Sequence, residues 1–177
     1  MKYLLLLILV FACVDLNAHP MPNSILLLDV KSNGVSAELH WPLKEFQFVF
    51  PNEDIDRDPN TLIEREGAWL DSYQLAHMRV SDMNGHSWTI SINSKKVVDA
   101  QQSFTGPYSE LIFQLWLQAP PGVSAQHFTM NYDAIMHQVV THKMLIRIRQ
   151  DWDGGLSAQD SLNADLGMLM VNPARWH

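Results

Sequence analysis

The chain has 177 residues, of which 47% are hydrophobic and 18% charged, and its formal net charge is −7. The apolar content excludes a disordered chain, and the acidic balance excludes a general binder of nucleic acid, which needs a clustered basic surface. The chain carries eight histidines but one cysteine, and a single cysteine excludes a disulfide framework or a multi-thiolate zinc site.

The first eighteen residues have the pattern of an export signal. Lys2 precedes an apolar run at residues 4–14, and the small residue Ala18 follows. The run is about half of the ~20 residues that a membrane-spanning helix needs, and every later apolar run is shorter, so we expect no transmembrane helix after it. Cleavage after Ala18 would leave residues 19–177 as a single extracytoplasmic domain, periplasmic or extracellular. The alternative is a lipid anchor on Cys13, which ends a degraded lipobox.

Two apolar-rich segments, residues 24–30 and 35–41, flank the pair Asn33-Gly34. Asn-Gly tolerates the positive φ that tight turns require, so the two segments predict a β-hairpin. Apolar and polar residues alternate along 35–41. This alternation predicts a strand with one face buried and the other in water.

A helix is expected at residues 62–77. Thr61 and Glu64 have the spacing of a capping box, in which each side chain reaches the other's backbone amide. Leu62, Trp69 and Tyr73 follow at helical spacing, so their apolar stripe should cover a sheet face.

The second half returns to short apolar segments bounded by Gly, Pro or Asn. These segments are residues 78–81, 88–92, 110–118, 128–132 and 144–149, the last ending at Asp151-Trp152. The first two flank an Asn84-Gly85 turn, and the chain after residue 155 offers only a short apolar tail. Strands at this density predict a mainly β fold, an antiparallel β-sandwich with one inserted or capping helix.

Histidines are the candidate metal ligands. At a mature N-terminus His19 would offer both its amine and its imidazole, which suits copper or nickel. His137 and His142 are five residues apart, a spacing that lets them converge only in a loop or across a turn. For all three, a surface or capping role is the simpler interpretation. His77, at the end of the predicted helix, is expected to favour the helix dipole.

Nucleophilic catalysis has little support in the sequence. No Gly-x-Ser-x-Gly motif occurs, and no serine stands with a histidine and an acid in a recognisable pattern. An enzyme is therefore the less favoured class.

Three stretches resemble a known family. Ala-His-Pro-Met-Pro-Asn-Ser at residues 18–24, followed by the hydrophobic hairpin, is similar to the N-terminal extracytoplasmic region of HupE/UreJ-type membrane proteins. Residues 137–143 and 147–152 resemble the closing strands of that region. The likeness covers residues 19 to about 155. It implies an association with nickel or cobalt permeation, which belongs to the family's membrane half. We expect this chain to be a version of the accessory domain without that half, or a shortened gene product.

Three functions are compatible with these observations. The leading hypothesis is an exported, non-enzymatic domain that binds a partner or a metal ion, with nickel, cobalt or copper at His19, His137 or His142. The alternative is a copper-dependent redox enzyme built on an N-terminal His19 chelate. The third is a sandwich that recognises a membrane-protein partner through exposed aromatic residues such as Trp152.

Overall fold

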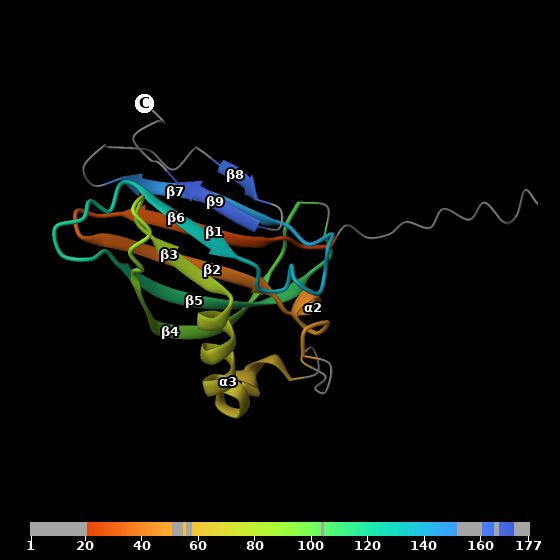
Figure 1. Cartoon of the computed structure of the whole chain (residues 1–177). Coiled ribbons are helices and arrows are strands. Elements are labelled where there is room, and N and C mark those ends of the chain that lie inside the picture. The colour runs from red at the N-terminus through yellow and green to blue at the C-terminus, as the bar shows by residue number, and fades with distance from the viewer. Residues whose placement is uncertain are drawn as a thin grey trace, which may run out of the picture.

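The computed structural model describes residues 21–50, 55, 58–103, 105–151, 161–164 and 167–171. In chain order its elements are β1 (Ser24–Val30), β2 (Gly34–Pro42), α2 (Leu43–Phe46), η1 (Pro59–Thr61), α3 (Leu62–Ala76), β3 (Met78–Ser81), β4 (Thr89–Ala100), β5 (Tyr108–Gln118), β6 (Phe128–Tyr132), β7 (Met144–Asp151), β8 (Ser161–Ala164) and β9 (Gly167–Val171). The strands form two sheets, ordered β4-β5-β2-β1-β7-β8 and β3-β6-β9. The predicted mainly β sandwich with one substantial helix is confirmed (Figure 1).

The β1–β2 hairpin forms where the sequence predicts it. Val30 pairs with Val35 across the turn, and β2 then pairs with β5 on its other side. β1 has a second neighbour, β7, and this pair is parallel. The predicted antiparallel sandwich thus contains one parallel pair, because β7 returns to β1 from a distant part of the chain instead of through a tight turn.

The Asn84-Gly85 turn joins the two sheets rather than two neighbouring strands. Gly85 has a positive φ of 86°, as the turn requires. β3, which precedes the turn, pairs with β6, whereas β4, which follows it, pairs with β5 in the other sheet. β4 also runs eight residues beyond the predicted end at residue 92, to Ala100. The predicted apolar tail contributes β9, which pairs with β6.

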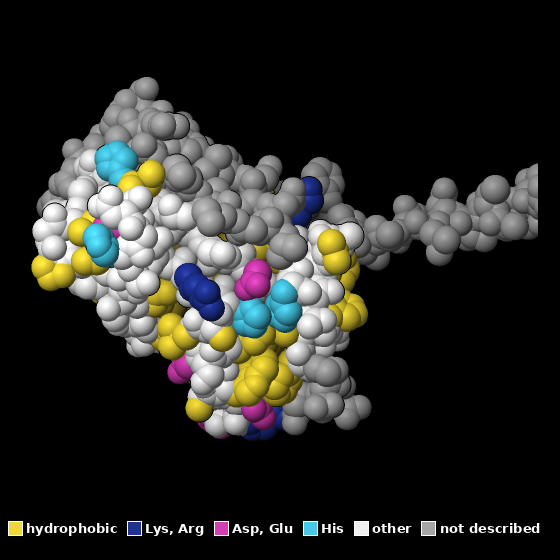
Figure 2. Space-filling view, in the orientation of Figure 1, with side chains coloured by type: hydrophobic (Ala, Val, Ile, Leu, Met, Phe, Trp, Pro, Cys, Tyr) yellow, Lys and Arg dark blue, Asp and Glu magenta, His cyan; other side chains and the backbone are white. Residues whose placement is uncertain are grey.

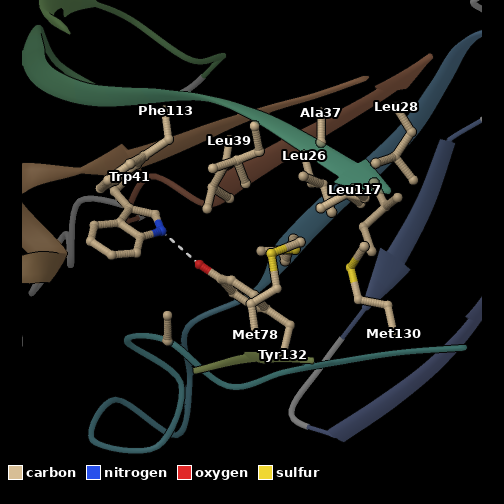
Figure 3. Packing of buried hydrophobic residues seen from close by; sticks show 14 of the residues in the cluster. Leu26, Leu28, Ala37, Leu39, Trp41, Met78, Phe113, Leu117, Met130 and Tyr132 are labelled. Carbon is tan, nitrogen blue, oxygen red and sulfur yellow. Dashed lines mark hydrogen bonds between the residues drawn. The ribbon is translucent and has the colours of Figure 1, made fainter. Parts of the chain in front are cut away.

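The core lies between the inner faces of the two sheets (Figure 3). Leu26, Leu39 and Phe113 from the larger sheet share it with Met78 and Met130 from the smaller one, and all are essentially inaccessible to solvent. One polar contact crosses this core, from the indole N–H of Trp41 to the hydroxyl oxygen of Tyr132 at 2.6 Å. It ties β2 to β6 and fixes how the sheets face each other.

Helix α3 lies against β4 and β3, at the edge of the sandwich away from β8 (Figure 1). It ends one residue before the predicted end. The predicted capping box is wrong: η1 gives Thr61 a near-helical backbone (φ −91°, ψ −4°), and its hydroxyl donates to Asp58 instead of capping the helix. The buried stripe is Leu62, Leu70, Tyr73 and Gln74, whereas Trp69 is 37% exposed.

Several predictions concern residues outside the described part of the chain. They are the signal peptide at 1–18, the lipid anchor at Cys13, the N-terminal chelate at His19 and the aromatic contact at Trp152. Within the described part, no helix is both long and apolar enough to cross a membrane.

Candidate functional site

Two histidines meet at one end of the smaller sheet. His77 directly follows α3 and precedes β3, and Asp133 directly follows β6. Because Met78 pairs with Tyr132 in the β3–β6 register, His77 and Asp133 continue that pairing, and the Asp133 N–H donates to the His77 carbonyl at 3.2 Å. The chain then turns within a few residues to His137. Figure 2 shows histidine side chains beside an acidic side chain on this face.

Asp133 orients both imidazole rings. Its carboxylate accepts a hydrogen bond from His77 Nδ1 at 2.7 Å, and its backbone carbonyl accepts one from His137 Nδ1 at 3.1 Å. Since both partners are acceptors, both Nδ1 atoms carry a proton, so in the neutral form of each ring Nε2 is the lone-pair nitrogen. The rings stack with their centroids 4.3 Å apart and an interplanar angle of 14°.

Neither Nε2 atom has a hydrogen-bond partner in the part of the chain that the structure describes. His77 is partly buried and His137 is exposed. Metal-binding histidines characteristically donate their other ring N–H to a carboxylate or a backbone carbonyl. The pair therefore has the donor atoms and the supporting contacts of two metal ligands. No group of three or more His, Cys, Asp or Glu side chains that could hold an ion occurs among the described residues.

The turn that carries His137 contains a strained residue. Ile135 has a φ of 65° and is fully buried, and for a β-branched residue this conformation costs about 1–3 kcal/mol. Its backbone N–H donates to the Tyr73 hydroxyl oxygen at 2.9 Å. Burial raises the pKa of Tyr73 to about 12, so the phenol stays neutral. Tyr73 thus holds the strained turn, and with it His137, against α3.

A polar hollow adjoins His77. His77, Arg79, Asn131 and Asp133 all line it. They share one face because Arg79 is paired with Asn131 in the β3–β6 register, two residues along from His77 and Asp133. Met78 and Tyr132, between them, point to the core.

Aromatic rings continue the histidine stack along α3. His77 contacts Tyr73 with ring centroids 4.4 Å apart, Tyr73 stacks on Trp69 at 5.1 Å, and Trp69 contacts Phe50 at 4.4 Å. Positions 69, 73 and 77 lie on one helix face because they are four residues apart. Figure 2 shows a hydrophobic patch beside the histidines.

His142 lies in a different environment from His137. Its Nε2 accepts from the Ser24 hydroxyl at 2.8 Å, and its Nδ1 lies 3.3 Å from a Glu45 carboxylate oxygen. This order of atoms matches that of Ser-His-acid hydrolases. All three side chains are buried, and Ser24 is fully inaccessible, so the contacts link β1, α2 and the loop before β7. Both ring nitrogens of His142 are already engaged.

A third histidine network covers the outer face of the larger sheet. His40 donates to Glu110 through Nδ1 at 2.7 Å and to Glu38 through Nε2 at 2.8 Å, and Tyr108 donates to Glu110 at 2.6 Å. Burial would lower the pKa of His40, but the hydrogen bonds and charges of the two carboxylates outweigh it and raise the pKa. Burial would raise the pKa of Glu110, and its bonds to His40 and Tyr108 lower it.

The structure therefore separates the two described candidate ligands, His137 and His142, and gives His137 a different neighbour, His77. Sequence reasoning assigned His77 to the helix dipole and overlooked Asp133. One local signal was present: Tyr73 and His77, like Asp133 and His137, are four residues apart. The contact between these two segments depends on the β3–β6 register, which the sequence does not reveal.

Comparison with known proteins finds no family model and no curated protein that matches the chain. The fold and this site define the class: a β-sandwich with an oriented histidine pair on the surface of its smaller sheet.

Proposed function

We propose that the protein is an exported, non-enzymatic binding domain that captures a divalent transition metal, nickel, cobalt or copper, through His77 and His137. One observation supports this most: both Nδ1 atoms donate to Asp133, which leaves both Nε2 lone pairs available on adjacent rings. The resemblance of residues 18–24 to a family associated with nickel and cobalt permeation agrees with the same choice of metals.

The donor chemistry favours these metals over others. Imidazole nitrogen suits nickel, cobalt, copper and zinc, whereas magnesium and calcium prefer oxygen ligands. Zinc sites in proteins take three or four protein ligands, and the described residues place no such group together. Two imidazoles leave the remaining coordination positions to water or to another ligand, so the metal stays exchangeable, as capture and transfer require.

Binding requires a small rearrangement of the rings. Coordination bonds lie in the plane of an imidazole, so two rings stacked at 14° must tilt toward a common ion. His137 is exposed and can tilt, while Asp133 keeps its hold on the partly buried His77. The ion would thus join the end of α3 to the turn that contains Ile135.

Calorimetric titration with nickel tests the proposal. We expect one nickel site in the wild-type protein, and its loss in His77→Ala and in His137→Ala. His86→Ala is the matched control, because His86 also bonds an aspartate through Nδ1, at 2.8 Å from Asp82, but its ring stacks on no other histidine among the described residues. Asp133→Asn should weaken nickel about 10- to 100-fold, because the Asp133 carboxylate orients a ligand. Equal affinity in wild-type protein and His137→Ala would refute the site.

His19 stays a second prediction for metal binding. A protein beginning at His19 can be compared with one that carries an extra N-terminal residue, which blocks the amine chelate but leaves His77 and His137 intact. Loss of copper binding only in the extended protein would favour the copper-dependent redox enzyme built on His19. Unchanged binding in both would favour the histidine pair.

A membrane-protein partner is a second candidate function, favoured by the aromatic residues beside the site. Phe48 and Trp69 are 54% and 37% exposed, and large exposed aromatic residues are typical of interaction surfaces. If a partner docks here, Trp69→Ala should abolish its capture by the protein, whereas nickel binding should persist.

A further inference from the structure

The hollow beside the histidine pair is also lined by a positively charged side chain, Arg79, which metal coordination alone does not require. Arg79 points outward from β3, and no acceptor or acidic group pairs with its guanidinium among the described residues. Asn131, directly opposite on β6, adds an amide that can donate a hydrogen bond. Both residues line the same hollow as His77 and Asp133.

The charges at this site favour an anion together with the metal. Arg79 contributes one positive charge and Asp133 one negative charge, while the two imidazoles are neutral when they act as ligands. A divalent ion would leave the site with two excess positive charges, and Arg79 repels that ion. A carboxylate chelator removes the excess, and a guanidinium binds carboxylates through paired hydrogen bonds.

The placement also suits a small polycarboxylate. His77 immediately precedes β3 and Arg79 is the second residue of that strand, and both line the same hollow. A molecule with several carboxylates can use one on the metal, where the histidine pair leaves coordination positions open, and another on Arg79. The hollow that Arg79 and Asn131 line together with His77 and Asp133 would receive the chelator.

We infer that the cargo of this site is a metal ion already chelated by a small di- or tricarboxylate, with His77 and His137 on the metal and Arg79 and Asn131 on the chelator. This inference rests on the proposed function, because the chelate is held through the metal. It names the class of ligand that the histidine pair alone does not specify.

Equilibrium dialysis with radiolabelled nickel and radiolabelled citrate tests the inference. The wild-type protein should retain nickel from a simple nickel salt, and with citrate present it should retain nickel and citrate together in equal amounts. Arg79→Gln should retain nickel from the salt as well as the wild type does, but bind the nickel–citrate complex about 10-fold more weakly, the effect of one charge-assisted contact. Lys96→Gln, which removes an exposed cation from β4 in the other sheet, is the matched control and should behave as the wild type.

The outcomes distinguish the two proposals. If citrate strips nickel from the wild type and no citrate is retained, the chelate inference is overturned while the metal site stands. Equal retention of nickel–citrate by Arg79→Gln and the wild type also overturns it. If the wild type retains no nickel from the simple salt, the metal site itself fails and the chelate inference fails with it. Loss of both labels in His77→Ala, with citrate alone never retained, supports the full arrangement.

Discussion

The hydroxyl of Tyr73 supports the turn that carries His137, and Tyr73→Phe removes that hydroxyl alone. The phenyl ring can keep its contacts with Trp69 and His77, because these involve the ring face. What is lost is the acceptor for the Ile135 N–H, now 2.9 Å from the hydroxyl oxygen. Ile135 is fully buried, so its N–H has no access to solvent as a replacement.

Two opposing contributions determine how far Tyr73→Phe lowers the free energy of unfolding. A buried N–H without a partner costs about 1–3 kcal/mol. The strain of Ile135 at a φ of 65° is of similar size, and its release when the turn relaxes limits the net loss. We therefore expect the free energy of unfolding to fall by about 1–2 kcal/mol. For a chain of this length that corresponds to a Tm about 2–8 °C lower.

Thermal unfolding followed by circular dichroism measures the loss of stability in Tyr73→Phe, and nickel titration of the same protein measures its loss of metal affinity. A relaxed turn no longer holds His137 beside His77, so nickel affinity should fall together with stability. Ser72→Ala, on the exposed side of the same helix, is the control and should shift stability by no more than about 0.5 kcal/mol. If Tyr73→Phe melts with the wild type and binds nickel equally well, the hydroxyl does not position His137.

Two further predictions concern the other histidine networks. Because the pKa of His40 is raised, its interactions stabilise the fold fully below about pH 6.5, and this stabilisation is lost as the pH rises through the pKa of His40 in the folded protein. The pKa of Glu110 is lowered, so its interactions stabilise the fold above about pH 4.5, and that stabilisation is lost at lower pH. Urea unfolding should therefore show wild-type stability falling from pH 6 to pH 9, and His40→Gln should flatten that dependence; parallel curves would contradict this account. Ser24→Ala should lower the free energy of unfolding by about 1–3 kcal/mol, because it leaves His142 Nε2 buried without its donor, and an effect as small as that of Ser32→Ala at an exposed site would contradict it.

Local patterns predicted the elements that depend on local chemistry. The hairpin of β1 and β2 was predicted from the alternation along residues 35–41 and the Asn33-Gly34 pair, and the structure confirms the hairpin and the alternation, although neither Asn33 nor Gly34 has a positive φ. Helix α3 follows from apolar spacing, although the sequence did not reveal that η1 would precede it and displace the cap.

Predictions failed where the pattern is interrupted or the partner is distant. The alternation along β4 breaks at a register shift between Ile92 and Ser94, and one extra residue reverses which side chains face inward. β4 is also an edge strand and is largely exposed, so it lacks the apolar signal of β5. The Asn84-Gly85 turn specified a reversal of the chain, but not that its two strands enter different sheets.

At the candidate site, too, local patterns were predictable from the sequence and long-range contacts were not. The sequence identified His137 as a candidate ligand, yet its neighbour His77 lies 60 residues away along the chain and reaches it only through the pairing of β3 with β6. The buried Ser24, His142 and Glu45 contacts likewise join three segments that share no local motif. Long-range strand register, rather than residue type, decides which histidines are adjacent.

The most direct test of the metal site is NMR spectroscopy of the imidazole nitrogens, first without metal and then during addition of nickel. His77 and His137 should both be protonated at Nδ1 before metal is added, because both Nδ1 atoms donate to Asp133. Nickel should then broaden the signals of these two rings first, while those of His86 persist. Protonation at Nε2 in either ring, or nickel broadening that spares His77 and His137, would contradict the proposed metal site.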